Sequence, residues 1–127
     1  MGKSKVTLWG SGTPRREFLH VDDLANAACF LMESYDAAGL LNVGVSKDVT
    51  ITELAQLIAR TVGYTGNIDF DRLRPEGTPC KLLDSSHTRT LGWRPQVSLE
   101  RGIASTYEWY VEHLVKVGKN LSCPTYA

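Results

Sequence analysis

The sequence predicts a small α/β protein in which short strands alternate with amphipathic helices. Segments such as 5–9 alternate apolar and polar residues, which is the period of a half-buried strand. Segments such as 51–62 repeat apolar residues every three or four positions, as a helix packed along one face does. Together these patterns predict a small sheet of short strands, one side of which is covered by three main helices.

The first third of the chain is predicted to contain two extended segments and a helix. A strand at 5–9 ends at the glycine-rich loop 10–14, and a second extended stretch covers 16–21. One of the two aspartates at 22–23 can then cap a helix that runs to about Tyr35. The apolar face expected for this helix consists of Leu24, Ala28, Leu31 and Tyr35, with Ala25, Ala27 and Phe30 beside it.

The middle of the chain contains the clearest helix start in the sequence. A short apolar strand is expected at 40–43, and a loop at 44–48. Thr50 and Glu53 have the spacing of a capping box, in which each side chain accepts the other residue's backbone N–H. The helix that begins there is expected to end at Gly63. Its predicted buried residues are Ile51, Leu54, Ala55, Ile58 and Val62.

A loop with two prolines and a glycine, residues 72–79, separates two further predicted strands. These strands lie at 67–70 and 81–84, and one or two helical turns then start at Ser85 or Ser86. Each of these elements is short, so their boundaries depend on the turn residues between them.

The last helix is predicted to begin after Ser98, whose hydroxyl can cap it. Its apolar face is expected to consist of Leu99, Ile103, Tyr107, Tyr110 and Leu114. The periodicity ends there, so residues 5–114 form the predicted domain and residues 115–127 a flexible tail.

Composition argues against several classes of protein. The 14 Lys and Arg balance the 14 Asp and Glu, whereas a general nucleic-acid binder needs a basic surface. No apolar run approaches the roughly 18 residues of a membrane span, and residues 1–5 lack the apolar core of a signal peptide. Cys29, Cys80 and Cys123 fit neither a zinc cluster nor a disulfide framework, which favours reduced thiols and a cytoplasmic location.

Common catalytic and cofactor motifs are absent from the sequence. The loop Gly-Ser-Gly at 10–12 lacks the third glycine of a dinucleotide fingerprint, because Arg15 occupies that position, and no helix is predicted directly after it. The histidines His20, His87 and His113 lie on separate elements without metal-ligand spacing. An ordinary glycine-rich turn and a hydrogen-bonded structural role for His20 are therefore favoured.

The residues that best suit ligand binding are scattered. Trp9 and Arg16 flank the glycine-rich loop, Arg72 and Arg74 lie in the 72–79 loop, and Lys81 follows it. Guanidinium groups suit diphosphates because they present several donors in one plane, and a tryptophan can stack on a base or sugar. Spacing alone favours the plainer interpretation, in which the tryptophan is a half-buried strand residue and the arginines are solvated.

The motifs around these residues resemble those of the GDP-L-fucose synthase family, which are extended short-chain dehydrogenases/reductases. The resemblance spans about residues 5–114. Its most particular segments are Trp-Gly-Ser-Gly-Thr-Pro at 9–14 and Pro-Glu-Gly-Thr-Pro-Cys-Lys-Leu-Leu-Asp at 75–84. The segment Arg-Glu-Phe-Leu-His-Val-Asp-Asp at 16–23 is shared with other nucleotide-sugar epimerases and dehydratases.

The resemblance implies that the chain is the C-terminal, substrate-binding lobe of such an enzyme, without its Rossmann lobe. The family enzyme epimerises C3 and C5 of GDP-4-keto-6-deoxymannose and reduces the C4 ketone with NADPH, which gives GDP-L-fucose. Its cofactor and its Ser–Tyr–Lys set belong to the Rossmann lobe, and no tyrosine of this sequence is followed by lysine at the fourth position. We therefore expect that this chain alone binds no NADP and is not catalytic.

The same resemblance implies substrate-binding roles for named residues. Arg16 would pair with the diphosphate, and Trp9 would shape the pocket for the nucleotide end. Arg74 belongs to the predicted binding set, and Lys81 matches a basic residue that would contact phosphate. Glu76 lies at a position that lines the family's substrate site, where the shorter Asp is common. No role is implied for Cys80.

The expected partner is a GDP-sugar, GDP-4-keto-6-deoxymannose or GDP-L-fucose, and a Rossmann lobe or a second copy would cover an exposed face. Two alternatives remain open. The chain could be the substrate lobe of a UDP- or dTDP-sugar epimerase or dehydratase, or a stand-alone interaction module of the same fold. The segment 78–81 favours the GDP-sugar lobe.

Overall fold

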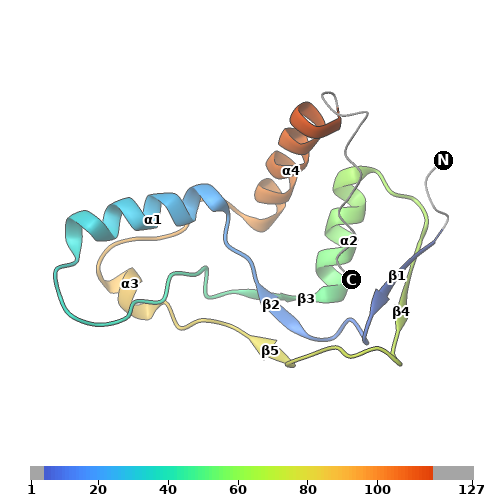
Figure 1. Ribbon diagram of the computed structural model, residues 1–127, viewed down its shortest axis with the longest axis horizontal. Helices are drawn as coiled ribbons and strands as arrows, with labels where there is room; N and C mark the ends of the chain where they lie inside the picture. The colour runs from blue at the N-terminus through green and yellow to red at the C-terminus, as the bar shows by residue number, and fades with distance from the viewer. Residues whose placement is uncertain (1–4, 116–127) are drawn as a thin grey trace.

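The computed structural model describes residues 5–115 and confirms the predicted α/β class (Figure 1). The strands are β1 (Lys5–Trp9), β2 (Arg15–Glu17), β3 (Asp48–Thr50), β4 (Asn67–Asp71) and β5 (Cys80–Lys81). The helices are α1 (Val21–Ser34), α2 (Ile51–Val62), α3 (Ser86–Thr90) and α4 (Leu99–Tyr110), and a π-helical turn η1 (Val111–Val115) continues α4. Helices α1 and α3 form one end of the molecule, β1 and β4 the other, and α2 and α4 lie between them.

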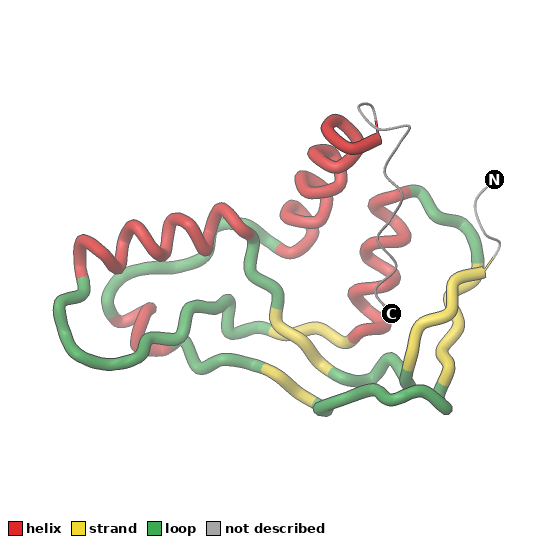
Figure 2. Tube along the Cα trace, viewed as in Figure 1, coloured by secondary structure: helices red, strands yellow, loops and turns green. Residues whose placement is uncertain are grey.

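The strands form two separate small sheets instead of the single sheet that the sequence suggested. In the first sheet β1 pairs with β4 in parallel, with Trp9 opposite Asp71. In the second, β2 lies between β3, which is antiparallel to it, and β5, which is parallel to it, with Arg16 opposite Lys81. Because β1 and β4 are parallel, the loops that follow them leave the same end of the sheet. Those two loops, 10–14 and 72–79, then run side by side to β2 and β5 (Figure 2).

Helix α2 begins and ends where the sequence predicted. The Thr50 N–H donates to Glu53 Oε2 at 2.7 Å, and the Glu53 N–H donates to Thr50 Oγ1 at 3.1 Å, so both halves of the capping box are present. The Thr50 N–H, and after it the Thr50 hydroxyl, which donates to Glu53 Oε2 at 3.0 Å, lower the pKa of Glu53 below its ordinary value. Gly63 ends the helix with a φ of 70°. The predicted apolar residues of α2 do share a face, but they are half-buried or exposed instead of buried.

We expect Thr50→Ala to lower the free energy of unfolding by about 1 kcal/mol, because the Glu53 N–H at the start of α2 loses its side-chain acceptor. The urea midpoint measured by far-UV circular dichroism checks this. Thr65→Ala, a change in an exposed loop, is the control. Equal midpoints for the two variants would contradict the capping contribution.

Helix α1 starts two or three residues earlier than predicted, and its cap is His20 instead of an aspartate. His20 Nδ1 accepts the Asp22 N–H at 3.3 Å, while His20 Nε2 lies 3.3 Å from Ser105 Oγ on α4. The structural role expected for His20 is thus confirmed. Asp23 has a different function, since only 4% of it is exposed and its carboxylate accepts the N–H groups of Gln96 and Val97. It ties α1 to the segment that leads into α4.

The apolar face predicted for α1 is only partly confirmed, since Leu31 and Tyr35 are half-buried whereas its other members are exposed. Ala27 and Asp23 are the buried residues of this helix, whereas Leu24 is 52% exposed and Ala28 is exposed. The helix is oriented so that the Asp23 carboxylate reaches the two backbone amides. Residues one turn apart lie on the same face of a helix, so those one turn from Asp23 also face inward. Ala27 and Trp93 are the buried apolar residues among those that the structure describes.

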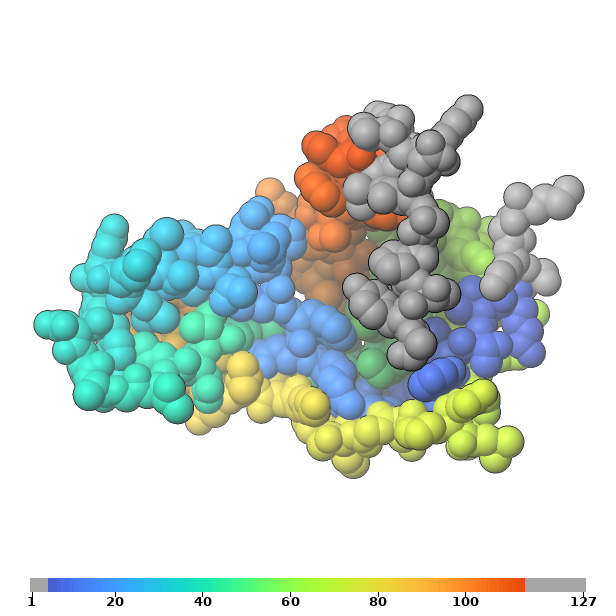
Figure 3. All heavy atoms as spheres, in the orientation of Figure 1, coloured from blue at the N-terminus to red at the C-terminus, as the bar shows by residue number. Residues whose placement is uncertain are grey.

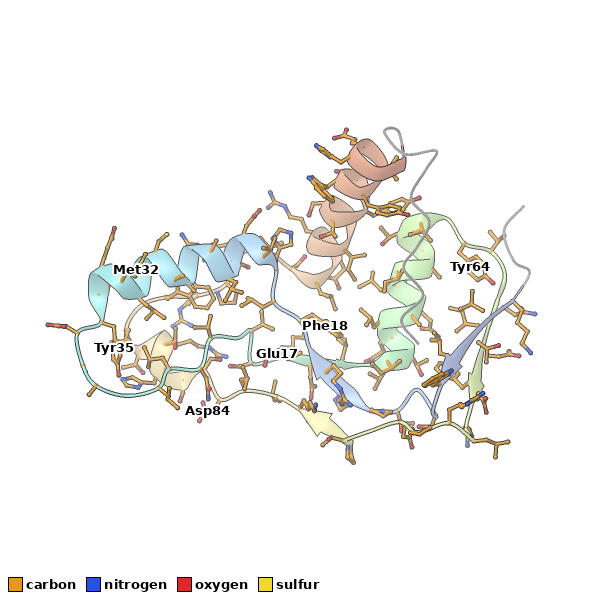
Figure 4. All side chains as sticks on the ribbon, in the orientation of Figure 1. Glu17, Phe18, Met32, Tyr35, Tyr64 and Asp84 are labelled. Carbon is orange, nitrogen blue, oxygen red and sulfur yellow. The ribbon has the colours of Figure 1, made fainter. Side chains whose placement is uncertain are left out.

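Three predicted strands are shorter than expected or are not formed, and Glu17 accounts for much of the difference. Its carboxylate accepts the N–H groups of Ser46 and Leu83, so these segments bond to a side chain instead of a strand (Figure 4). Accordingly, β2 ends at Glu17 and β5 ends at Lys81. Residues 40–43 form no strand, because no neighbouring strand pairs with them in the described part of the chain.

Two features predicted near the C-terminus are confirmed. The Ser98 hydroxyl accepts the Arg101 N–H at 3.3 Å and caps α4, and α3 lies where the helical turns were expected. The predicted tail lies outside the described residues except for residue 115, as do Cys123 and the side chain of Leu114. In the range 5–115, no helix has the length and apolar character that crossing a membrane requires.

Candidate functional site

The glycine-rich loop and the 72–79 loop lie against each other (Figure 3, blue against yellow-green), and hydrogen bonds join them directly. The Gly10 N–H donates to the Asp71 carbonyl at 2.9 Å. One residue further on, the Ser11 N–H donates to Glu76 Oε2 at 2.8 Å, and the Ser11 hydroxyl donates to the same oxygen. Gly10 has a φ of 85°, and a Cβ at this position would overlap the Glu76 side chain. Only glycine therefore permits this close approach of the two loops.

The glycine-rich loop rests on the N-terminus of α2. The Ile51 N–H donates to the Pro14 carbonyl, and the Thr52 N–H and hydroxyl both donate to the Gly12 carbonyl, at distances between 2.9 and 3.0 Å. The first amides of α2 are thus used within the protein. Strand β2 follows the loop, which agrees with its interpretation as a glycine-rich turn.

Trp9 and Arg74 form an exposed aromatic–cation pair above this junction. Trp9 ends β1 and is 66% exposed. The Arg74 Cζ atom lies 5.3 Å from the centre of the Trp9 ring, within the range of a cation–π contact. Arg74 Nε also lies 3.5 Å from Asp71 Oδ2, so the guanidinium group is held from the end of β4. The pair is consequently oriented by both parallel strands.

Arg16 and Lys81 lie side by side on β2 and β5. They are opposite each other in a parallel ladder, which places their side chains on the same face. The Arg16 Nη1 atom donates to the Arg15 carbonyl at 2.7 Å, and a Cβ on Gly77 would lie 3.7 Å from Arg16 Nη2. The guanidinium group therefore passes next to the 72–79 loop. No carboxylate of residues 5–115 forms an ion pair with Arg16 or Lys81.

Arg15, by contrast, is paired within the protein. Its Nε and Nη2 atoms lie 2.9 and 2.8 Å from Asp48 Oδ1, and this contact lowers the pKa of Asp48. The Cys80 thiol donates to the other oxygen of Asp48 at 3.5 Å, which raises the pKa of Cys80. The thiol thus stays protonated at neutral pH, in keeping with the absence of an expected role.

Glu76 is ionised at neutral pH. The Ser11 hydroxyl and the Ser11 N–H lower the pKa of its carboxyl group, and Arg72 adds a smaller effect of the same sign. The sequence singled out Glu76 but not its partner Ser11, although a serine between two glycines is a residue whose hydroxyl and N–H are both accessible as donors.

The five residues predicted for the site thus lie along one stretch of structure. Trp9, Arg74 and Glu76 gather where β1 and β4 end, Arg16 reaches the same loop at Gly77, and Lys81 lies beside Arg16. Aromatic, cationic and hydrogen-bonding groups in this arrangement suit a ligand that carries both a flat ring system and an anionic group.

Comparisons with known proteins find several GDP-L-fucose synthases among the similar relatives. The model of the NAD dependent epimerase/dehydratase family matches residues 1–44. GDP-L-fucose synthase 1 of Arabidopsis thaliana is 48% identical over 89% of this chain, which corresponds to 35% of the relative. GDP-L-fucose synthase of Escherichia coli (strain K12) is 50% identical over 85% of this chain and 36% of its own length.

A solved structure also matches most of this chain but only part of its own length. The GDP-L-fucose synthetase of Naegleria fowleri, bound to NADP, is 27% identical with a TM-score of 0.80, and the match covers 85% of this chain and 35% of the neighbour. The chain spans about a third of the length of the curated relatives it matches. Over most of its length, the chain is therefore similar to about one third of the length of the GDP-L-fucose synthases, and its first 44 residues match the NAD dependent epimerase/dehydratase family.

Proposed function

We propose that residues 5–114 form the GDP-sugar-binding lobe of an enzyme that resembles GDP-L-fucose synthase. The observation that carries this proposal is the pair Arg16 and Lys81, two adjacent cations that no carboxylate of residues 5–115 neutralises. Arg16 is only half-exposed, so its charge is directed to a limited volume beside the 72–79 loop. A diphosphate supplies two anionic groups at the spacing that such a pair needs.

The nucleotide end of the ligand is assigned to Trp9 and Arg74. The large exposed part of the Trp9 ring offers a stacking surface for a guanine base or a ribose. Arg74 lies against the same ring and adds a positive charge near the phosphate path. The GDP-sugar would therefore extend from the end of β1, along the 72–79 loop, to Arg16 and Lys81.

Catalysis in this proposal depends on residues that this sequence does not contain. NADP supplies the hydride in the whole family enzyme, and in this proposal its site belongs to the Rossmann lobe. The lobe contributes binding and orientation of the sugar nucleotide, which brings the reacting carbon to a fixed place. We expect no NADPH oxidation by the 127-residue chain alone.

The exposed apolar residues of α1 support the proposal that another protein surface covers this helix. Val21, Leu24 and Met32 are all exposed on this helix, while the described residues bury few apolar side chains. We propose that the cofactor-binding remainder of the enzyme covers this face. A second copy of the chain is the alternative occupant that light scattering would reveal.

An NMR titration of the isotope-labelled chain with GDP-L-fucose tests the binding proposal. We expect selective shifts around Trp9, Arg16 and Arg74, much smaller shifts with dTDP-glucose, and no selective shifts for Trp9→Ala. Equal responses to both ligands would favour a lobe that accepts other nucleotide sugars. Absence of shifts at millimolar ligand, together with a defined oligomer in light scattering, would instead favour a stand-alone interaction module.

A further inference from the structure

We infer that Ser11 and Glu76 form a latch that positions the Trp9–Arg74 pair for nucleotide binding, an inference that rests on the proposed function. The latch is the contact in which the Ser11 N–H and hydroxyl both donate to Glu76 Oε2. In this assignment Glu76 is a positioning residue, because its carboxylate is bonded to the protein instead of facing a ligand.

The Ser11 side chain is fixed from two directions. Its hydroxyl oxygen lies 2.7 Å from Thr13 Oγ1 and accepts the Thr13 N–H at 3.2 Å, while its own hydrogen is directed to Glu76. A hydroxyl group has one hydrogen to donate, so the Thr13 hydroxyl donates to Ser11 in this network. The donors that Ser11 presents to Glu76 are thereby held in place before any ligand binds.

The latch and the aromatic–cation pair are connected by matching positions on the two loops. Ser11 follows Trp9 by two residues, and Glu76 follows Arg74 by two residues. At the strand ends, the Asp71 carbonyl accepts the N–H groups of Gly10 and Arg74, at 2.9 and 3.2 Å. The Trp9–Arg74 contact therefore lies between two fixed points, Asp71 on one side and the latch on the other.

Removing the latch would free the middle of the 72–79 loop, whose end stays bonded through the Pro79 carbonyl to the Arg15 N–H at 2.8 Å. The remaining restraints on Arg74 are its backbone bond to Asp71 and a 3.5 Å contact between Nε and Asp71 Oδ2. Both the Arg74 and Asp71 side chains are partly exposed, and such exposed pairs contribute little on their own. The guanidinium group would then move away from the Trp9 ring for part of the time, which weakens the stacking surface.

The latch also makes the arrangement of this site dependent on pH. The Glu76 carboxyl group has a pKa below its ordinary value because of the two Ser11 donors, and the charged group that adds to this effect is Arg72. A lowered pKa in the folded protein means that the latch is complete at neutral pH. It is lost as the pH falls through that lowered pKa.

The first test requires no ligand. In the labelled wild-type chain, the Ser11 amide resonance should move with pH, with a midpoint below the ordinary pKa of glutamate, which is about 4.3. This movement should be absent in Glu76→Gln, and it should be retained in Glu33→Gln, which removes a carboxylate from an exposed position on α1. A Ser11 amide that does not titrate, or that titrates equally in Glu76→Gln, overturns the latch.

The second test measures the dissociation constant for GDP-L-fucose. Ser11→Ala and Glu76→Ala are each expected to raise it about fivefold at neutral pH, the size of effect that follows loss of one charge-assisted hydrogen bond at a partly exposed site. Glu76→Gln, which keeps an acceptor oxygen, should bind more tightly than Glu76→Ala. Unchanged affinity in Ser11→Ala and Glu76→Ala would refute the positioning role. If the Ser11 amide titrates but the wild-type chain binds no GDP-sugar, the proposed function fails while the latch itself stands.

Discussion

Trp93→Ala is expected to lower the free energy of unfolding by about 4 kcal/mol, the size of effect that follows truncation of a buried tryptophan. Trp93 is 4% exposed and is the one large apolar residue that is fully buried among residues 5–115. Its indole Nε1–H donates to Asn26 Oδ1 at 2.9 Å, and its backbone N–H donates to the Thr88 carbonyl at 3.3 Å. Trp93 therefore bonds to α1 through its side chain and to α3 through its backbone, and removal of the buried side chain leaves a cavity next to α1.

The matched control for this prediction is Trp109→Ala. Trp109 lies on α4 and is 54% exposed, so the same substitution removes the same atoms from a site without a surrounding core. We expect it to cost less than about 1 kcal/mol. Urea unfolding followed by far-UV circular dichroism measures both variants without relying on tryptophan fluorescence. Similar midpoints for the two variants would show that the Trp93 side chain does not carry the packing next to α1.

Elements whose signals are local were predictable from the sequence. Helix α2 is an example, because Thr50 and Glu53 form the capping box within four residues and Gly63 supplies the left-handed end. The Ser98 cap of α4 has the same property. Strands β1 and β4 also lie where their alternating residues placed them. In each case the hydrogen bonds or periodicity that define the element involve residues close together in the chain.

Elements that depend on distant partners were predicted less well. Asp23 was interpreted as a cap, yet its carboxylate accepts N–H groups 73 and 74 residues away, and this contact determines which face of α1 is buried. Residues 40–43 are apolar enough for a strand, but a strand also needs a neighbour with which to pair. The secondary-structure propensity of a segment contains no information about the distant amides that a side chain bonds or about the strand that would pair with the segment.

In the candidate site, the residues were predictable from local motifs, whereas the contacts between them were not. Trp9, Arg16, Arg74, Glu76 and Lys81 could be named from the motifs around them. The contact between Ser11 and Glu76 joins residues 65 positions apart, and it exists because the parallel pairing of β1 and β4 sends both loops from the same sheet edge. The closeness of Arg16 to Gly77 follows from the parallel pairing of β2 and β5. Strand pairing was not predictable from these short segments.

Arg16→Gln is expected to raise the dissociation constant for GDP-L-fucose about 10- to 100-fold, because loss of a charged hydrogen-bonding group from a diphosphate contact removes interactions of that size. Glutamine is a polar side chain that resembles arginine in length up to its amide group. The substitution therefore removes the positive charge and most of the N–H donors of the guanidinium group. No acidic side chain of residues 5–115 depends on Arg16 for pairing. The fold should therefore tolerate the substitution. Isothermal titration calorimetry at neutral pH measures the effect.

Arg15→Gln provides the matched control, since it removes the same group from the adjacent residue on the opposite face of β2. The Arg15 guanidinium is paired with Asp48 and is not directed to the proposed ligand, so we expect its loss to change affinity less than about twofold. Added salt should weaken wild-type binding more than binding by Arg16→Gln, because the wild type has one more cation whose attraction to the diphosphate is screened. If Arg15→Gln and Arg16→Gln lose affinity equally, the effect is one of general charge at β2, and the specific pairing of Arg16 with a diphosphate is wrong. If only Arg16→Gln loses affinity, the face of β2 that Arg16 shares with Lys81 is the one that binds the anionic part of the ligand.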